Sequence, residues 1–494
     1  MSQIAFDLSP SAVPKLQLLD PRWDVLLREA KARFGITQLR PGQRDLIDAV
    51  LRGRDTLGIL PTGAGKSLAY QLPAFVLPGV VVVVSPLIAL MKDQRDHLAA
   101  AGLRVVELDS TIGVREQRSG AEALLHHDQC IVYVTPERLE NEACLAMLAA
   151  RGVSLLAIDE AHCVSQWGHD FRPAYLRVAE AARRLGRPPI LALTATATVA
   201  VQADIITQLG LRDVDVVRPS VERLNLGLYV HRAPNEAMKD AYLEEILRDT
   251  PGAAIVYCTT IKATEAQHER LPGSVHYHAK LSDHDREDAR HRFMDGRARV
   301  IVATKAFGMG VDKKDVRAVI HTQLPDSIES YYQEAGRAGR DGKPAAAHFL
   351  YRIEDVRIQQ WFLATKAPPR SDLLTMVDLL ALGPATTTEA ALAEAAKLGK
   401  RKTQAVLAHL ERLGAVALAG GTITRKIAAR DAREIAALLD GYAARALGDR
   451  ERLHRMEHFA QTVECRTKMV LEYFGESVTG ACNRCDVCIP RRMS

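Results

Sequence analysis

The stretch Leu60-Pro61-Thr62-Gly63-Ala64-Gly65-Lys66-Ser67 follows a short apolar run and precedes a segment of helical character. Its glycines let the backbone wrap around phosphate oxygens, and the free amides at a helix N-terminus favour anions. Lys66 would neutralise the β- and γ-phosphates of a nucleotide, and the Ser67 hydroxyl would bind Mg²⁺. The stretch therefore predicts a nucleotide-binding loop in a parallel α/β sheet. The cofactor-binding residues predicted here are Thr62, Gly63, Gly65, Lys66 and Ser67.

An acidic pair, Asp159-Glu160, ends the apolar run Leu155–Ile158 and is followed by Ala161-His162. On its own, an acidic pair after a strand is more often a solvated loop. A carboxylate at the carboxyl end of a strand beside a phosphate-loop strand can, however, hold Mg²⁺. We therefore predict that Asp159 binds the metal and that Glu160 orients or deprotonates the water that attacks the γ-phosphate.

A second charged motif, Gln333-Glu334-Ala335-Gly336-Arg337-Ala338-Gly339-Arg340-Asp341-Gly342, stands late in the chain. Two arginines three residues apart on a helix face the same direction. From a second lobe, Arg337 and Arg340 would reach the γ-phosphate across a cleft, a contribution that can raise the hydrolysis rate by roughly 10³–10⁵-fold. Surface arginines are the alternative, but the surrounding glycines argue against it. The predicted catalytic set is Lys66, Asp159, Glu160, Arg337 and Arg340.

The composition points to a globular protein without a membrane segment. The chain has 494 residues, which suggests about three or four domains, and its hydrophobic fraction of 47% is enough for buried cores. We find no apolar run of the roughly 18–20 residues that span a bilayer, and no secretory signal over residues 1–20. We therefore expect a cytoplasmic protein. The net charge of +5 permits nucleic-acid binding and fits an ordinary soluble enzyme equally well.

Apolar β-prone runs alternate with helical stretches from Thr56 to Leu350, after an amphipathic helix predicted over Arg22–Phe34. Continuous apolar strands between helices are typical of parallel α/β sheets covered on both faces. The stretch is too long for one sheet, and the motif series restarts around Val216–Asn235, so we predict two RecA-like α/β lobes in tandem. The predicted strands include Val80–Ser85, Ile131–Thr135, Leu155–Ile158, Ile190–Leu193, Ala254–Tyr257, Val300–Ala303 and Ala318–His321.

Residues 370–426 differ in character from the lobes. Two or three helices precede the β-prone runs Ala415–Leu418 and Thr422–Thr424, and Gly420-Gly421 between these runs indicates a hairpin. This order resembles a winged helix, and a plain helical connector is the alternative. Residues Ala432–Arg455 are expected to be helical. The predicted domains are 1–215 with the nucleotide loop and acidic pair, 216–352 with the arginine pair, 353–430 as the winged-helix-like segment, and 431–494 as a helical metal-binding module.

Four of the eight cysteines gather near the end of the chain, where Cys465 is followed by Cys482, Cys485 and Cys488. In a long chain of intracellular type, such a cluster indicates a metal rather than disulfides. Four thiolates suit tetrahedral Zn²⁺ in a closed structural site, and binding can contribute about 10–16 kcal/mol to a small module. An iron–sulfur cluster is the alternative, because four cysteines can hold either.

Several motifs in this order resemble those of superfamily-2 helicases and, within them, the RecQ family. Leu39-Arg40-Pro41-Gly42-Gln43 resembles the adenine-reading motif, and Ser165–Pro173 resembles the aromatic-rich loop particular to RecQ. The strict phosphate-loop pattern has glycine where Leu60 stands, but superfamily 2 commonly lacks that glycine. Further similar stretches are Ser85–Gln94, Thr135–Arg138, Leu193–Thr198, Tyr257-Cys258, Tyr277–Ala279, Ala303–Asp312 and Leu471–Glu476.

The resemblance also implies roles for individual residues. Gln43 would bond to the adenine edge while Arg40 lies against the base. Trp167 and Phe171 would stack on unpaired bases, at about 1–3 kcal/mol each; two buried aromatic residues that anchor a loop are the alternative. The implied nucleotide contacts are Arg40, Gln43, Asp312 and Gln333, and the implied nucleic-acid contacts are Ser85, Thr135, Trp167, His169, Phe171, Arg172, His278 and Thr304.

By this resemblance the chain would be a 3′–5′ DNA helicase of recombination and repair that uses ATP, Mg²⁺ and Zn²⁺. It would act, as a monomer, on single-stranded and partly duplex DNA. The alternatives are an RNA helicase of the same superfamily, a DNA translocase that does not unwind, and a DNA-binding scaffold with an inactive ATP site. One departure from the best-known RecQ arrangement is the order of the accessory segments, because here the winged-helix-like segment precedes the cysteine cluster.

Overall fold

The structure is a computed structural model of the chain. It describes residues 20–86, 88–108, 129–165, 167–168, 170–308, 313–366, 368–412, 415–419, 422–426 and 432–489. His169, Asp312 and the Gly420-Gly421 turn, all of which carried predictions, lie outside these ranges.

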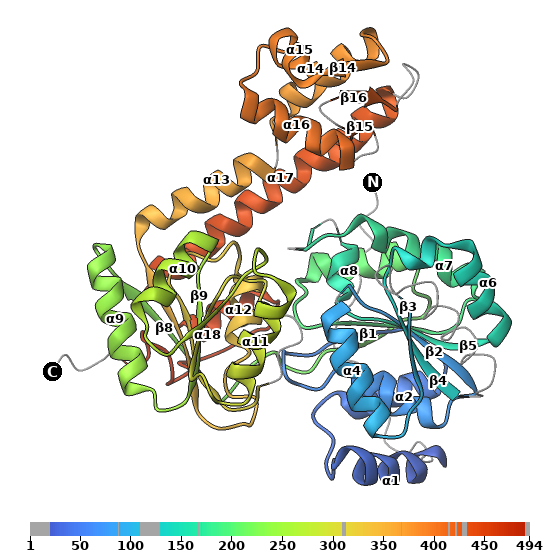
Figure 1. Ribbon diagram of the computed structural model, residues 1–494. Coiled ribbons are helices and arrows are strands. Elements are labelled where there is room, and N and C mark those ends of the chain that lie inside the picture. The colour runs from blue at the N-terminus through green and yellow to red at the C-terminus, as the bar shows by residue number, and fades with distance from the viewer. Residues whose placement is uncertain are drawn as a thin grey trace.

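The first lobe is a parallel sheet of seven strands in the order β3-β4-β2-β5-β6-β1-β7, with helices on both faces (Figure 1). Its central strands are buried along almost their whole length, as in β2, where Val80–Val84 are all buried. Burial on both faces is the reason why such strands have continuous apolar sequences. The strands are β1 (Thr56–Ile59), β2 (Gly79–Val84), β3 (Val105–Leu108), β4 (Gln129–Val134), β5 (Val153–Ile158), β6 (Ile190–Thr194) and β7 (Asp215–Val217), and the helices are α1 (Arg22–Phe34), α2 (Gln43–Leu51), α3 (Leu68–Gln71), α4 (Ile88–Ala100), α6 (Glu142–Arg151), α7 (Val178–Arg184) and α8 (Val199–Leu209).

The second lobe is a parallel sheet of six strands in the order β10-β11-β9-β12-β13-β8. The prediction of two tandem parallel α/β lobes is therefore confirmed. Since β7 still pairs with β1 in the first sheet, the change from one sheet to the next lies between Val217 and Leu226. The strands are β8 (Leu226–Arg232), β9 (Ala253–Tyr257), β10 (Val275–Tyr277), β11 (Val300–Ala303), β12 (Val316–His321) and β13 (Ala345–Tyr351), and the helices are α9 (Glu236–Asp249), α10 (Ile261–Arg270), α11 (Asp283–Met294) and α12 (Ile328–Ala335).

Two long helices, α13 (Val356–Lys366) and α17 (Ala432–Gln461), connect the second lobe to a small module at the top of Figure 1. This module has its own apolar core and a three-stranded antiparallel sheet. Its order of helix, strand, two helices and hairpin is that of a winged helix, as the sequence suggested. Strand β14, built from three threonines, had not been predicted. The elements are α14 (Arg370–Leu382), β14 (Thr386–Thr388), α15 (Glu389–Ala395), α16 (Lys400–Arg412), β15 (Val416–Ala419) and β16 (Thr422–Arg425).

The cysteine-bearing segment packs on the second lobe. After α17 and α18 (Arg466–Tyr473) the chain returns to the edge strand β8, where the Asp486 amide donates to the Leu228 carbonyl oxygen at 3.2 Å. Phe459, Phe474 and Cys485 belong to the apolar core of the second lobe. The winged-helix-like module therefore intervenes in the sequence between the motor and the cysteine segment, which are nevertheless adjacent in space.

Candidate active site and metal centre

The predicted phosphate loop lies between β1 and α3, where β1 ends at the carboxyl edge of the first sheet. Gly63 and Gly65 have φ angles of +82° and +74°, a conformation that glycine adopts at little steric cost. A side chain at Gly63 would meet the second lobe, because an ideal Cβ there lies 3.1 Å from Cγ of Arg340. A nucleotide bound to this loop would consequently lie between the lobes.

The acidic pair follows β5 in the same sheet. Burial, followed by the neighbouring Glu160 carboxylate, raises the pKa of Asp159 to about 7, and Lys66 opposes this shift. Two adjacent carboxylates of this kind fit a divalent cation, whose charge would reverse the shift. Oε2 of Glu160 lies 3.3 Å from Nδ1 of His162, and the same nitrogen lies 3.0 Å from Oγ1 of Thr194 at the end of β6. The pair is thus connected to the Leu193–Thr198 motif.

The second-lobe arginines occupy different positions from those expected. The prediction that both stand on a helix is wrong, because α12 ends at Ala335 and the next residues form turns, with φ at +63° for Gly339. Their side chains therefore diverge. Arg340 lies against the phosphate loop, whereas Arg337 is buried beside Gly308, where an ideal Cβ would be 2.8 Å from its Nη2. Of the two, Arg340 is the one at the phosphate loop in this conformation.

Gln43 and Arg40 brace the phosphate loop from the first lobe. Nε2 of Gln43 donates to the carbonyl oxygens of Ala64 and Gly65 at 2.9 and 3.0 Å, and its Oε1 accepts from the Arg40 amide at 2.8 Å. The Arg40 guanidinium donates to the Gly63 carbonyl oxygen. Their adenine-reading role stays a prediction, as does the nucleotide contact of Gln333, which lies half-buried on α12.

Four residues predicted to contact DNA lie at the carboxyl edges of the two sheets. Ser85 and Thr135 directly follow the neighbouring strands β2 and β4, and His278 and Thr304 directly follow β10 and β11. The structure thus brings them together in pairs. Because Ser85, Thr135 and His278 are only 1%, 5% and 3% exposed, a DNA contact would need a local opening, and their DNA contacts stay predictions.

The aromatic-rich loop rests on α17. Arg452 of this helix donates Nη1 to the Trp167 carbonyl oxygen at 2.7 Å, and the Trp167 side chain is 47% exposed. Phe171 is half-buried, and Arg172 donates to the Pro86 carbonyl oxygen at 3.2 Å. The Trp167 indole is therefore accessible for stacking, whereas Arg172 is engaged with the first lobe. Arg452 belongs to no motif, so its contact with a loop 285 residues away had no sequence signal.

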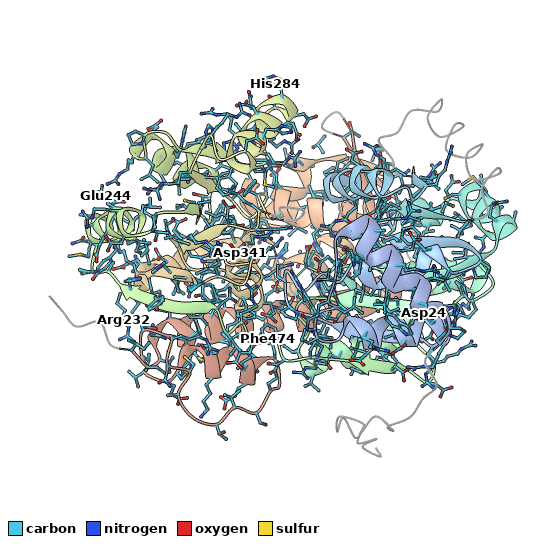
Figure 2. The ribbon with its side chains drawn as sticks, turned by 90° about the horizontal axis from the view of Figure 1, so that it is seen from below. Asp24, Arg232, Glu244, His284, Asp341 and Phe474 are labelled. Atoms are coloured by element: carbon cyan, nitrogen blue, oxygen red, sulfur yellow. The ribbon has the colours of Figure 1, made fainter. Side chains whose placement is uncertain are left out.

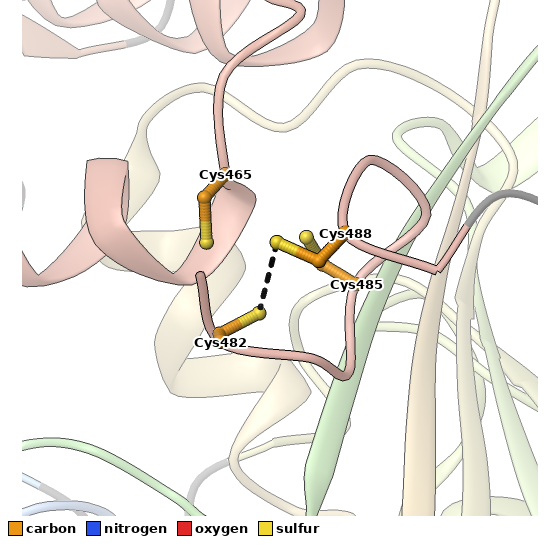
Figure 3. A group of neighbouring side chains, drawn as sticks. All are labelled: Cys465, Cys482, Cys485 and Cys488. Carbon is orange, nitrogen blue, oxygen red and sulfur yellow. Dashed lines mark hydrogen bonds between the residues drawn. The ribbon is translucent and has the colours of Figure 1, made fainter. Parts of the chain in front are cut away.

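The four clustered cysteines converge in space (Figure 3). The four sulfur atoms all lie within 4.8 Å of one another, and the sulfur atoms of Cys482 and Cys488 are 3.8 Å apart. The four residues are Cys465, Cys482, Cys485 and Cys488. Burial raises the pKa of Cys485, and a bound cation favours the thiolate form of its cysteine ligands. The donor set fits tetrahedral Zn²⁺. Cys465 stands immediately before α18 and accepts from the Lys468 amide at 3.5 Å.

Three family models match this chain. The DEAD/DEAH box helicase model matches residues 40–205, the helicase conserved C-terminal domain matches 238–342, and the RecQ zinc-binding model matches 429–489. The last match favours zinc over an iron–sulfur cluster at the four cysteines. Within the described residues, no helix is long and apolar enough to cross a membrane.

Known proteins resemble the chain over most of its length. A probable ATP-dependent DNA helicase RecS of Bacillus subtilis is 35% identical over 451 residues, covering 90% of this chain and 87% of the relative. The ATP-dependent DNA helicase RecQ of the same organism is 41% identical, covering 67% of this chain and 56% of the relative. Among solved structures, the helicase Lhr of Mycobacterium smegmatis bound to ssDNA and AMP-PNP shares the fold, with a TM-score of 0.54 at 21% identity over 81% of this chain and 60% of that one.

Proposed function

This chain belongs to the RecQ family of ATP-dependent DNA helicases, and we propose from this premise that it couples ATP hydrolysis to 3′–5′ movement along single-stranded DNA and separates duplex strands. The observation that carries the proposal is the approach of Arg340 from the second lobe to Gly63 of the phosphate loop. A nucleotide between them would be contacted by both lobes, so its hydrolysis and release would change how the lobes meet.

At the nucleotide, Ser67 and Asp159 would hold Mg²⁺, which neutralises phosphate charge when bound. Lys66 would bind the β- and γ-phosphates, and Glu160 would orient or deprotonate the attacking water. Arg340 would contact the γ-phosphate, and Arg337 would join it once the cleft closes. In the zinc-binding segment, the four cysteines would hold a structural Zn²⁺ with no open position for catalysis.

On the DNA side, we propose that one strand crosses the carboxyl edges of both sheets and is contacted mainly through its phosphates. Binding of this kind is insensitive to sequence, and it weakens as salt rises. The chain spans 87% of the RecS relative and 56–62% of the bacterial RecQ relatives. Roles in recombination and repair and a monomeric state are therefore part of the proposal.

The test is ATP turnover by the purified full chain without nucleic acid, with a single-stranded DNA oligonucleotide and with the matching RNA, followed by strand separation on a duplex with a 3′ tail. We expect DNA to raise kcat severalfold and RNA to have less effect. Stimulation by RNA above that by DNA would favour an RNA helicase. Turnover without strand separation would favour a translocase, and turnover that DNA does not change would contradict the motor.

The accessible indole of Trp167 leads to a separate prediction. Replacing it with alanine should remove one stacking contact, worth about 1–3 kcal/mol, and so raise the half-saturating oligonucleotide concentration by on the order of 10-fold. Trp167→Phe keeps an aromatic face and is the matched control. Titrations of ATP turnover against a single-stranded oligonucleotide measure the effect, and equal values for the alanine and wild-type chains would show that Trp167 does not contact the strand.

A further inference from the structure

The linker between the two sheets, residues 218–225, is held from one side by the cysteine-bearing segment. The Arg218 guanidinium donates to the Phe474 carbonyl oxygen, and the Glu476 carboxylate accepts from Ser220 Oγ at 2.6 Å and from the Val221 amide at 2.7 Å. Figure 2 shows Phe474 and Asp341, the residue after Arg340, both toward the middle of the molecule, where the lobes meet. The linker is therefore held in place at the junction between the lobes.

From this linker, the Arg223 guanidinium donates hydrogen bonds to both lobes at once. Nη1 donates to the carbonyl oxygens of Thr62 and Gly336, each at 3.1 Å. Nη2 donates to the carbonyl oxygens of Ala338 and Gly339, at 3.0 and 2.9 Å. Thr62 belongs to the phosphate loop of the first lobe, whereas the other three residues belong to the turns that carry Arg337 and Arg340.

The chemistry explains why an arginine stands here. Among the described residues, the carbonyl oxygens of Gly336 and Ala338, just beyond the end of α12 at Ala335, accept no backbone amide, and the carboxyl end of a helix attracts a cation. A guanidinium offers five N–H donors in a rigid plane, whereas an ammonium is a single point. One half-buried arginine thus donates to three turn carbonyls, of which that of Gly339 also accepts from the Gly342 amide at 3.0 Å, and to a fourth carbonyl across the lobe boundary.

The boundary itself is tight at this point. An ideal Cβ on Gly336 would lie 3.1 Å from Cβ of Thr62, and one on Gly63 would lie 3.1 Å from Cγ of Arg340. Asn225 adds a second support, since its Nδ2 donates to the carbonyl oxygens of Gly339 and Lys343 at 2.8 Å each. Contacts from the linker therefore fix the position of the arginine turns, the turns that carry Arg337 and Arg340, relative to the phosphate loop.

We propose that Arg223 is a positioning residue for ATP hydrolysis: its guanidinium bridges the Thr62 carbonyl of the phosphate loop and the carbonyls of the arginine turns, and so sets where Arg337 and Arg340 stand relative to the γ-phosphate. This inference rests on the ATPase function proposed above. Arg223 touches no reacting atom, and its effect is transmitted through the backbone of the two loops that it joins.

The test compares Arg223→Lys and Arg223→Met with the wild-type full chain, by kcat and KM for ATP at saturating single-stranded DNA and by equilibrium binding of ADP. Because a misplacement of about 1 Å can cost on the order of 10²-fold in rate, we expect kcat to fall by roughly 10–100-fold in both variants. ADP affinity should stay within about 3-fold of wild type, because the ground-state contacts of the phosphate loop remain. Lysine keeps the charge but cannot bridge four carbonyls, so it should not restore kcat.

The matched control is Arg297→Met, since Arg297 is an exposed arginine of the second lobe that pairs with Asp295. It should keep kcat near the wild-type value. A near-normal kcat in both Arg223 variants would overturn the proposal, as would a kcat loss matched by the Arg297 control or accompanied by equal loss of ADP binding or by unfolding at the assay temperature. A wild-type chain that DNA does not stimulate would instead contradict the proposed function, whatever the Arg223 variants do.

Discussion

Replacing Glu160 with glutamine should lower kcat for DNA-stimulated ATP hydrolysis by on the order of 10³-fold, because general acid–base contributions amount to roughly 10²–10⁴-fold. Glu160 stands two residues after the buried strand β5 with a φ of 49°, an uncommon backbone conformation for a residue other than glycine. Among the described residues, its Oε2 is buried without a hydrogen-bond partner, although it lies 3.3 Å from His162 Nδ1. This oxygen therefore has an unfilled acceptor position, which a water molecule would reach after a local opening of the site.

Phosphate release from saturating ATP and single-stranded DNA measures the Glu160→Gln effect, and ADP binding by the same variant checks that the nucleotide loop is intact. Glu180→Gln is the matched control, because Glu180 is an exposed glutamate of the same lobe that pairs with Arg183. Its kcat should equal that of the wild type. If Glu160→Gln kept more than about a tenth of the wild-type kcat, a loss below the range for acid–base roles, the assignment of Glu160 to the attacking water would be wrong.

The two sheets were predictable because their strands are buried on both faces. In β2 and β5 this burial leaves continuous apolar runs such as Val80–Val84 and Leu155–Ile158, whose ends carry the polar residues of the site. The cysteine cluster was predictable for a different reason, because three of its four cysteines lie close together in the sequence. The phosphate loop, the acidic pair and the cysteines could thus be identified without knowledge of the fold.

What the sequence did not predict depends on contacts between distant segments. The arginine turns were expected on a helix because spacing alone does not reveal where α12 ends. Arg223 and Arg452 belong to no motif recognised in the sequence. Their roles follow from hydrogen bonds to carbonyl oxygens more than 100 residues away in the chain, that of Gly336 for Arg223 and that of Trp167 for Arg452. Likewise, the order of segments in the sequence suggested that the winged-helix-like module separates the cysteines from the motor. In the structure, α13 and α17 hold this module away from the second lobe, and the cysteine segment packs on β8.

This docking of the cysteine segment makes metal removal the second change with a large expected effect. Cys485 is fully buried in the core that β8, α12 and α17 share, and it forms a β-bridge with Leu228. We therefore expect Cys485→Ser, or prolonged chelation of the wild type, to remove bound zinc and to destabilise the second lobe along with the segment itself. If about 4 kcal/mol of the roughly 10–16 kcal/mol that zinc binding contributes stabilises the second lobe, removal of the zinc should lower the Tm by about 10 °C.

Zinc content by atomic emission and thermal unfolding by calorimetry measure the two parts of this prediction on the full chain. Cys144→Ser is the matched control, because Cys144 is also buried but lies on α6 of the first lobe, away from the four ligands. It should retain one zinc ion per chain, as a single four-cysteine site requires. A zinc-free Cys485→Ser chain that unfolds at the wild-type temperature would mean that the metal orders only its own segment. The shared core of Phe459, Phe474 and Cys485 argues against this outcome, because a collapse of the cysteine segment would uncover apolar surface of the second lobe itself.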